Sequence, residues 1–348
     1  MSAGDAQPGL DEAALHDWLP AHVQDLHAPF TFELIAAGGS NLTYRVTDAV
    51  GHTVALRRPP VTAVLATAHD MDREWRILAA LYHHSEVPVP VPLAHCADPE
   101  VTGAPFYVMD FVDGRILRTP ADSADFTAEQ YVAATESLVD VQAMFHALDV
   151  DAVGLGELAR TRTGYVERQL KRWMAQVDAG RVRELPVLDE VHAALAASVP
   201  AESGAPGLVH GDYRFDNTVL GPDRRLVAVL DWELATIGDP AADFAWSCCY
   251  WNDPGDPVPF IEAAPTLDPG FLRRAEMVEM YAEQSGRDLS GFGWLHAFSY
   301  WKMGCIVEGV YARRLKGATG GMGGGDPDSI ARRAEGFVHH AAALLAAR

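Results

Sequence analysis

The sequence predicts an α+β protein in which a small antiparallel sheet comes first and a larger set of helices follows. Five short apolar runs bounded by turn residues predict strands, at residues 30–36, 43–47, 52–57, 93–97 and 106–111. From about residue 127 onward, apolar residues recur every three or four positions over longer stretches, which predicts helices. Strands in one part of a chain and helices in another are typical of an α+β fold with two parts.

Two further helices are predicted around the strands. Residues 10–24 carry apolar side chains at helical spacing ahead of the first strand, and residues 69–83 do so after the third. The later helices are predicted at about residues 127–148, 164–178, 187–198, 270–285, 294–316 and 329–347. The alternating Val-Pro run at 87–92 predicts an extended linker, because proline lacks the N–H that a helix uses. The glycine-rich stretch 317–325 predicts a flexible break, with a mobile lid as the alternative.

The composition is that of a globular protein with room for two hydrophobic cores. The 348 residues carry a net charge of −21, and 49% of them are hydrophobic. No apolar run approaches the roughly 20 residues that span a bilayer, and residues 1–9 are polar, so we expect a cytoplasmic protein without a membrane segment. The acidity argues against nucleic-acid binding. The four cysteines lack Cys-x-x-Cys spacing and are expected to be buried free thiols: Cys96, Cys248, Cys249 and Cys305. The oligomeric state stays open.

The densest chemistry in the sequence lies between residues 208 and 233. Asp212 and Asn217 are five residues apart in a predicted loop, and Asp231 ends the apolar run 226–230. A carboxylate and an amide oxygen that meet from neighbouring segments suit magnesium, which binds few protein ligands and fills its shell with water and phosphate. The carboxylate of Asp212 is then free to accept a proton. The alternative is that a lone Asp-x-x-x-x-Asn pattern is a capped turn.

The run His-Gly-Asp-x-x-x-x-Asn at 210–217, followed by Asp-Trp-Glu at 231–233, resembles the aminoglycoside phosphotransferase and choline kinase family. This resemblance implies a bilobal protein-kinase-like fold and a reaction that transfers the γ-phosphate of ATP, or of GTP, to a small-molecule hydroxyl. It implies that Asp212 is the catalytic acid–base group and that Asn217 and Asp231 hold Mg²⁺.

The same resemblance assigns nucleotide-binding residues in the first part of the chain. The turn Gly38-Gly39-Ser40-Asn41 would let backbone amides approach the phosphates, although an ordinary hairpin turn is the alternative. Val54-Ala55-Leu56-Arg57 resembles the kinase pattern Val-Ala-Ile-Lys, which places Ala55 beside adenine and Arg57, in place of lysine, at the phosphates. Glu74 would pair with Arg57. The alternatives are a surface arginine on an edge strand and a solvated glutamate on a helix.

The segment 106–114 resembles the hinge of the family, where backbone groups bond the adenine edge. The residues implied are Asp110, Phe111 and Val112. The hinge sets the predicted division into a nucleotide-binding lobe, residues 1–112, and a catalytic and substrate-binding lobe, residues 113–348.

The acceptor is less defined than the reaction. The candidate acceptor residues are Arg168 and Arg172, in a basic segment, together with Tyr250, Trp251, Asp253, Trp301 and Glu308. Arg57-Arg58-x-Pro and Arg168-Gln169-x-x-Arg172-Trp173 resemble the phosphotransferase domains fused to some acyl-CoA dehydrogenases, which implies a hydroxyacyl-CoA. The alternatives are an antibiotic kinase for aminoglycosides or macrolides, and a nucleotide-binding pseudokinase scaffold.

Overall fold

The computed structural model describes residues 7–37, 41–60, 70–253, 255–256, 259–261, 263–317 and 326–347. Its contacts divide the chain into two units. Unit 1 comprises Met1–Asp113 with Val227–Glu233, and unit 2 comprises Gly114–Leu226 with Leu234–Arg348. The predicted second lobe, 113–348, therefore contributes one short segment to the first unit.

Unit 1 is built on the antiparallel sheet that the sequence predicts. Its strands are β1 (Thr31–Ala37), β2 (Leu42–Thr47), β3 (Thr53–Arg58), β4 (Pro92–Cys96) and β5 (Phe106–Asp110). They lie in the order β1-β2-β3-β5-β4, so β3 is flanked on both sides. All four pairings are antiparallel.

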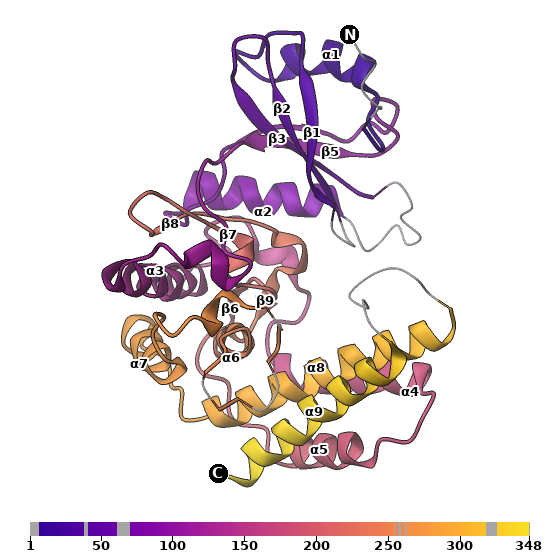
Figure 1. Ribbon diagram of the computed structural model, residues 1–348, viewed down its shortest axis with the longest axis vertical. Coiled ribbons are helices and arrows are strands. Elements are labelled where there is room, and N and C mark those ends of the chain that lie inside the picture. Colours follow the sequence, from indigo (N-terminus) through magenta and orange to yellow (C-terminus); the bar gives the residue numbers. More distant parts are fainter. Residues whose placement is uncertain are drawn as a thin grey trace. The chain divides into compact units, whose positions relative to one another are not determined.

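A helix covers each face of this sheet (Figure 1). Leu15 and Leu19 of α1 (Glu12–His22) pack in one cluster with Val54 and Leu56 of β3. Leu78 of α2 (Met71–His84) packs in another cluster with Ala55 and with Tyr107 and Met109 of β5. Because side chains alternate along a strand, Arg57 lies on the same face as Ala55, beside α2.

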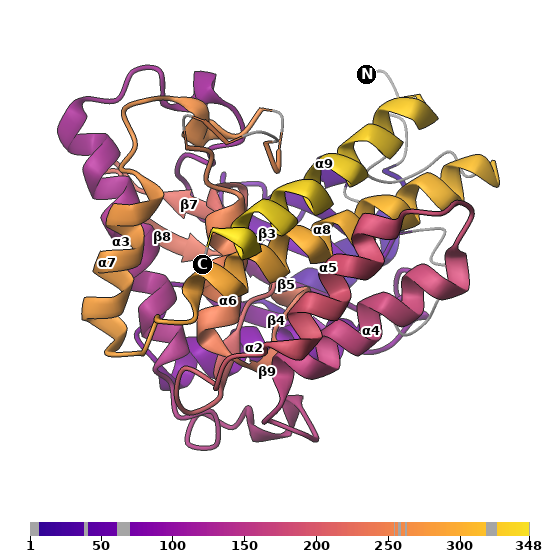
Figure 2. The ribbon, with the colours of Figure 1, turned by 90° about the horizontal axis from the view of Figure 1, so that it is seen from below.

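Unit 2 is mainly helical. Its helices are α3 (Ala128–His146), α4 (Tyr165–Gly180), α5 (Pro186–Ala197), α6 (Pro240–Cys249), α7 (Arg274–Ser285), α8 (Phe292–Leu315) and α9 (Pro327–Ala346). The long helices α8 and α9 lie side by side (Figures 1 and 2). The sequence analysis predicts all of these except α6. Most of the predicted glycine-rich break, residues 318–325, lies outside the described residues.

Short strands and turns position the loop that carries the chemistry. Within unit 2, β6 (Gly207–Val209) pairs with β9 (Thr236–Gly238) in antiparallel fashion. β7 (Thr218–Leu220) is followed by a turn and then by β8 (Leu226–Val229). Single 3-10 turns lie at Pro120–Ser123, Gly156–Leu158, Phe215–Asn217, Trp232–Leu234 and Pro265–Leu267. The segment 210–217 therefore begins where β6 ends and finishes where β7 begins.

Two expectations from composition can be compared with the structure. All four cysteines are free and buried, as predicted. Among the described residues, no helix has both the length and the apolar character needed to span a membrane.

Candidate active site

The loop that follows β6 depends on a glycine. Gly211 has φ +85°, a conformation that glycine adopts without the strain a side chain would impose. A Cβ at this position would lie 3.1 Å from Leu234 Cβ and 3.2 Å from the Leu234 carbonyl oxygen. The backbone therefore turns sharply here because residue 211 has no side chain.

Asp243 of α6 holds this loop from beneath. Its carboxylate accepts hydrogen bonds from the backbone amides of His210, at 3.0 Å, and Gly211, at 2.8 Å. His146 Nε2 lies 3.1 Å from the same carboxylate. Burial alone would raise the pKa of Asp243, but the bonds to His146 and the interactions with His210 lower it. Asp243 therefore fixes the loop by accepting two of its backbone amides.

Asp212 is held from both sides within unit 2. Asn217 Nδ2 donates to the Asp212 carbonyl at 2.8 Å and to its Oδ2 at 3.0 Å. The Tyr250 hydroxyl donates to Oδ1 at 2.5 Å. The Asp212 amide donates to His210 Nδ1 at 3.3 Å, so His210 contacts the loop backbone at this residue. The sequence therefore brings Asp212 and Asn217 together as expected, and Tyr250 joins them.

Arg214 completes the group, although the sequence analysis did not place it there. Its Nε lies 3.4 Å from Asp212 Oδ1, and its Nη1 lies 3.0 Å from Asp216. The guanidinium carbon is 4.9 Å from the centre of the Tyr250 ring. Arg214 is thus a partner of Asp212 and of Asp216. The signal that identifies it is an arginine two residues after the aspartate.

Tyr250 is a hydrogen-bond donor that keeps its proton. Burial raises the pKa of its phenol well above the usual value, and the Asp212 carboxylate raises it further. Tyr250, Arg214 and Asp216 also line a small pocket of about 20 Å³. A neutral hydroxyl therefore lies against the carboxylate that is the candidate proton acceptor.

In unit 1, Arg57 is the centre of a buried charge cluster. Its Nε lies 2.9 Å from Glu74 Oε1, and its Nη2 contacts Asp231 Oδ1. The Arg57 side chain is 11% exposed and that of Glu74 is 2% exposed. Both alternatives from the sequence are therefore wrong: β3 is an inner strand, and Glu74 is not solvated. Burial would lower the pKa of Arg57, but Glu74, Tyr107 and Asp231 outweigh it and raise that pKa.

Acidic oxygens are in excess around Arg57. Glu233 Oε2 lies 4.0 Å from Arg57 Nη2 and accepts a hydrogen bond from Asn41 Nδ2 at 3.0 Å. Asp231 has φ +65°, an uncommon conformation for a residue other than glycine. Three carboxylates thus lie around one guanidinium, so this cluster carries net negative charge and presents oxygens.

The chemistry of these oxygens fits a magnesium ion. No group of three His, Cys, Asp or Glu residues in the described part of the chain could hold a metal by itself. Asn217 Nδ2 donates its hydrogen bonds to Asp212. The Asn217 amide oxygen accepts no hydrogen bond from the described residues. The Asn217 amide oxygen in unit 2 and the Asp231 carboxylate in unit 1 are each hard-oxygen groups of the kind that magnesium binds.

The remaining nucleotide candidates lie where the sheet of unit 1 ends. Asp110 closes β5 and donates its amide to the Val91 carbonyl at 2.9 Å. The Arg45 guanidinium lies 4.2 Å from the centre of the Phe111 ring. The Val112 amide has no hydrogen-bond acceptor among the described residues. Gly38, Gly39 and Ser40 lie outside the described residues, whereas Asn41 is buried.

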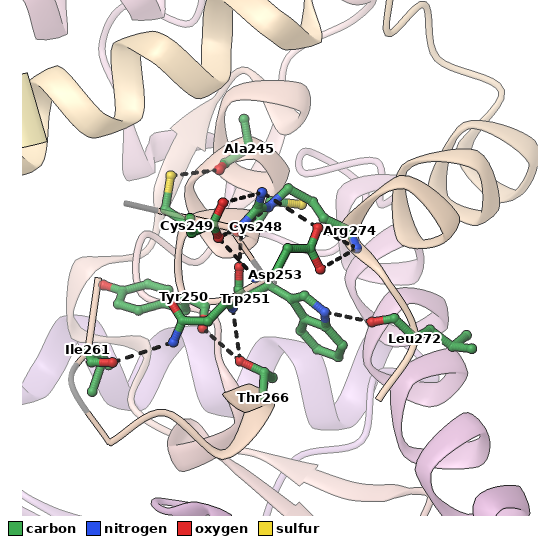
Figure 3. A network of polar contacts seen from close by, with 12 residues as sticks. Ala245, Cys248, Cys249, Tyr250, Trp251, Asp253, Ile261, Thr266, Leu272 and Arg274 are labelled. Carbon is green, nitrogen blue, oxygen red and sulfur yellow. Dashed lines mark hydrogen bonds and ion pairs between the residues drawn. The ribbon is translucent and has the colours of Figure 1, made fainter. Parts of the chain in front are cut away.

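Several candidate acceptor residues prove to be structural. Trp251 is 3% exposed, and its indole N–H donates to the Leu272 carbonyl at 2.8 Å. Asp253 accepts the Arg274 amide at 3.3 Å, beside the guanidinium that also bonds the Cys248 carbonyl (Figure 3). These contacts fasten the segment after α6, which corrects the expectation that Trp251 and Asp253 contact the acceptor.

Two more candidates on α8 are also structural. Trp301 is fully buried and donates to the Leu188 carbonyl at 3.1 Å. Glu308 is 5% exposed and pairs with Arg183 at 2.7 Å. The expectation that they contact the acceptor is corrected, because their polar groups are already satisfied inside the helical core. The aromatic and acidic composition of α8 could not distinguish core from binding surface.

Arg168 and Arg172 of the predicted basic segment differ in their surroundings. The Arg168 guanidinium bonds the carbonyls of Thr161 and Thr163, just before α4. Arg172 is exposed, and its guanidinium carbon is 5.7 Å from the centre of the Trp173 ring. Arg172 is therefore free for a ligand in a way that Arg168 is not.

A phosphotransferase is the class that this fold and these side chains define, and comparison with known proteins agrees. Residues 31–289 match the phosphotransferase enzyme family called APH, and the chain belongs to that family. Acyl-CoA dehydrogenase family member 11 of Rattus norvegicus is 34% identical over 314 residues, which cover 88% of this chain and 39% of that protein. A probable acyl-CoA dehydrogenase of Arabidopsis thaliana is 36% identical over 297 residues, covering 80% and 36%. The chain thus spans well under half the length of these relatives.

Solved structures share the fold. A protein of Ralstonia eutropha, provisionally named an aminoglycoside phosphotransferase, superposes with a TM-score of 0.81 at 28% identity, covering 97% of this chain and 98% of that one. The GDP and kanamycin complex of an aminoglycoside phosphotransferase gives a TM-score of 0.60 at 15% identity, covering 94% and 99%. This second likeness shows the fold alone.

Proposed function

We propose that this protein transfers the γ-phosphate of ATP or GTP to a hydroxyl group of a small molecule, with Mg²⁺ as cofactor. The contact between Tyr250 and Asp212 carries the proposal. A hydroxyl donates to this carboxylate at 2.5 Å, which is the hydrogen bond that an acceptor hydroxyl must make before it loses its proton. Asn217 and His210 fix the carboxylate in that position.

The other residues supply binding and charge. Arg57, held by Glu74, meets the phosphates, and Asp231 and Asn217 hold the Mg²⁺ that offsets their charge. Ala55, Asn41 and the backbone of 110–112 enclose the nucleotide. Support comes from the family and from the GDP that a structural relative binds. The intact set Asp212, Asn217 and Asp231 opposes the pseudokinase alternative.

The acceptor that we favour is a hydroxyacyl-CoA. The relatives with the higher sequence identities are named acyl-CoA dehydrogenases, and a kinase acting on hydroxylated acyl groups would share their substrates. The antibiotic alternative has support from structures with aminoglycosides, at identities too low to transfer a substrate. Exposed Arg172 suits a ligand with negative charge.

The test is transfer of labelled γ-phosphate in the presence of Mg²⁺. Hydroxyacyl-CoA, the matching acyl-CoA without the hydroxyl, and kanamycin are the three acceptors compared. We expect label on the hydroxyacyl-CoA alone and a loss of roughly two to four orders of magnitude in Asp212→Asn, which lacks the proton acceptor. Nucleotide binding should persist in that variant. Label on kanamycin would support the antibiotic alternative, and unimpaired turnover in Asp212→Asn would refute the role of Asp212.

A further inference from the structure

A lysine inside unit 2 forms no ion pair with any residue that the structure describes. Lys302 of α8 is one of three lysines in the chain, and its ammonium lies 3.6 Å from the centre of the Trp246 ring. The Trp173 ring centre is 5.8 Å away. No carboxylate or carbonyl among the described residues is hydrogen bonded or ion paired to this ammonium. Arg183, another partly buried cation of the unit, is by contrast ion paired with Glu308.

The tryptophan beneath this lysine also lacks a partner. Trp246 is 6% exposed, and its indole N–H is buried without an acceptor in the part of the chain that the structure describes. A buried donor without an acceptor destabilises the fold, so natural proteins rarely leave one unused. Trp246 and Lys302 together therefore present donors that the protein itself does not satisfy.

A second cation stands at the edge of the same group. The Arg172 guanidinium carbon is 5.7 Å from the centre of the Trp173 ring, and the Lys302 ammonium is 5.8 Å from the same centre. Arg172 is exposed and makes no ion pair with a described residue. In a chain with a net charge of −21, two cations and one indole N–H gather here without an acidic partner.

Burial disfavours the charged form of Lys302. Burial lowers the pKa of the ammonium to about 8, Asp243, Asp212 and Cys249 act to raise it, and Arg172 acts to lower it. At neutral pH the group is still mostly cationic. An anion beside it would supply what desolvation has removed.

Ring contacts connect this group to the candidate proton acceptor. The Trp246 and Tyr250 rings are 5.9 Å apart and edge to face, one turn apart on α6 and its cap. The Tyr250 hydroxyl in turn bonds Asp212. The unsatisfied donors thus lie one aromatic ring beyond the tyrosine that contacts the catalytic carboxylate.

We propose that Lys302, the Trp246 indole N–H and Arg172 form a subsite for an anionic oxygen group, a carboxylate or a phosphate, carried by the acceptor molecule. This inference rests on the proposed phosphotransferase function for the identity of the acceptor, but not for the binding of the anion. It assigns the acceptor two features: a hydroxyl that reaches Asp212, and a negative group that reaches Lys302.

The competing explanation is that the ammonium simply packs on two tryptophan faces, as cations do in many proteins. Packing alone requires the aromatic face but makes no use of the indole N–H. A Trp246→Phe variant keeps the face and removes the donor, so it separates the two explanations.

The three lysines make the test direct. The protein is labelled with ¹³C and ¹⁵N in lysine only, and the ammonium-end resonances are followed by NMR while inorganic phosphate is added in one series and acetate in another. Lys302→Met assigns the Lys302 signal. We expect saturable movement of that signal, with Lys171 and Lys316 as internal references. Saturation with phosphate alone indicates a phosphate subsite, and saturation with acetate indicates a carboxylate subsite.

The variants give the decisive comparison. We expect Trp246→Phe and Arg172→Gln each to weaken the anion binding seen at Lys302 by at least about tenfold, the value of one charge-assisted hydrogen bond. Exposed Lys316→Met should leave it unchanged. Thermal unfolding of each variant confirms that it is folded. A Lys302 signal that stays still with both anions, or binding that survives Trp246→Phe and Arg172→Gln, overturns the proposal. Turnover is not needed for this readout, so its result is independent of the kinase assay.

Discussion

The hydroxyl of Tyr250 donates to the carboxylate of Asp212 at 2.5 Å, the position that an acceptor hydroxyl would take. The phenol keeps its proton, because burial and the carboxylate both raise its pKa. An acceptor must therefore displace this hydrogen bond or share the carboxylate with it.

Tyr250→Phe removes that competition while keeping the ring against Trp246 and Arg214. We expect the KM for the acceptor to fall about three- to tenfold, because a hydrogen bond worth about 1 kcal/mol no longer has to be broken. The KM for the nucleotide should not change. Steady-state kinetics with both substrates varied measures it, and a rise in the acceptor KM would show instead that Tyr250 binds the acceptor.

Arg57→Lys tests why arginine stands where the resemblance expects lysine. Two nitrogens of the guanidinium reach two different carboxylates, Glu74 and Asp231, and one ammonium has no matching fork. We expect a folded protein with nucleotide affinity reduced about tenfold, measured by titration calorimetry. Arg76→Lys, at an exposed position of α2, is the matched control. Equal or tighter binding by Arg57→Lys would contradict a phosphate role that depends on the fork.

His146 makes the stability of unit 2 depend on pH. Burial lowers its pKa although Asp243 acts to raise it, so the imidazole stays neutral, accepting from Tyr281 at Nδ1 and donating to Asp243 at Nε2. A base whose pKa is lower in the folded state takes up its proton first in the unfolded state. The free energy of unfolding should therefore fall as the pH drops below about 6.5, the ordinary histidine value.

Chemical denaturation between pH 5 and pH 7.5 measures that fall. His146→Gln should lose part of the slope in this range, whereas exposed His22→Gln should keep all of it. Identical slopes for His146→Gln and the unchanged protein would rule out this linkage.

Lys302 makes the stability of unit 2 depend on pH in the alkaline range. Its pKa is about 8 in the folded protein against about 10.4 for an ordinary lysine. Below about pH 8 both states are protonated and the buried charge destabilises the fold fully. Between about pH 8 and pH 10.4 only the unfolded state keeps the proton, so this destabilisation is progressively relieved.

Lys302→Met should therefore raise the melting temperature at pH 7, because methionine fills a similar volume on the Trp246 ring without a charge. The gain should shrink as the pH rises toward 10. Scanning calorimetry at several pH values measures it. A variant that is less stable than the unchanged protein at pH 7 would mean that the ammonium has a stabilising partner.

Local pattern determined most of the elements and the residues of the catalytic loop. Strand alternation located β1 to β5, helical spacing located α3 and α8, and the spacing of Asp212 and Asn217 placed both in one loop, because each of these signals lies within a few residues of chain. The pairing of Arg57 with Glu74 could be expected only through the resemblance. Patterns in the sequence thus predicted only features formed by residues that are close together in the chain.

Tertiary packing decided the rest. The sequence around Trp301 and Glu308 has the same composition as a binding surface, and only the helices packed around them satisfy their polar groups and bury them. Lys302 shows the converse, since its position between Trp246 and Trp173 joins three helices that are far apart in the chain. Burial and partnership depend on long-range contacts, so the sequence determined which groups exist and the fold determined which of them are left free to bind.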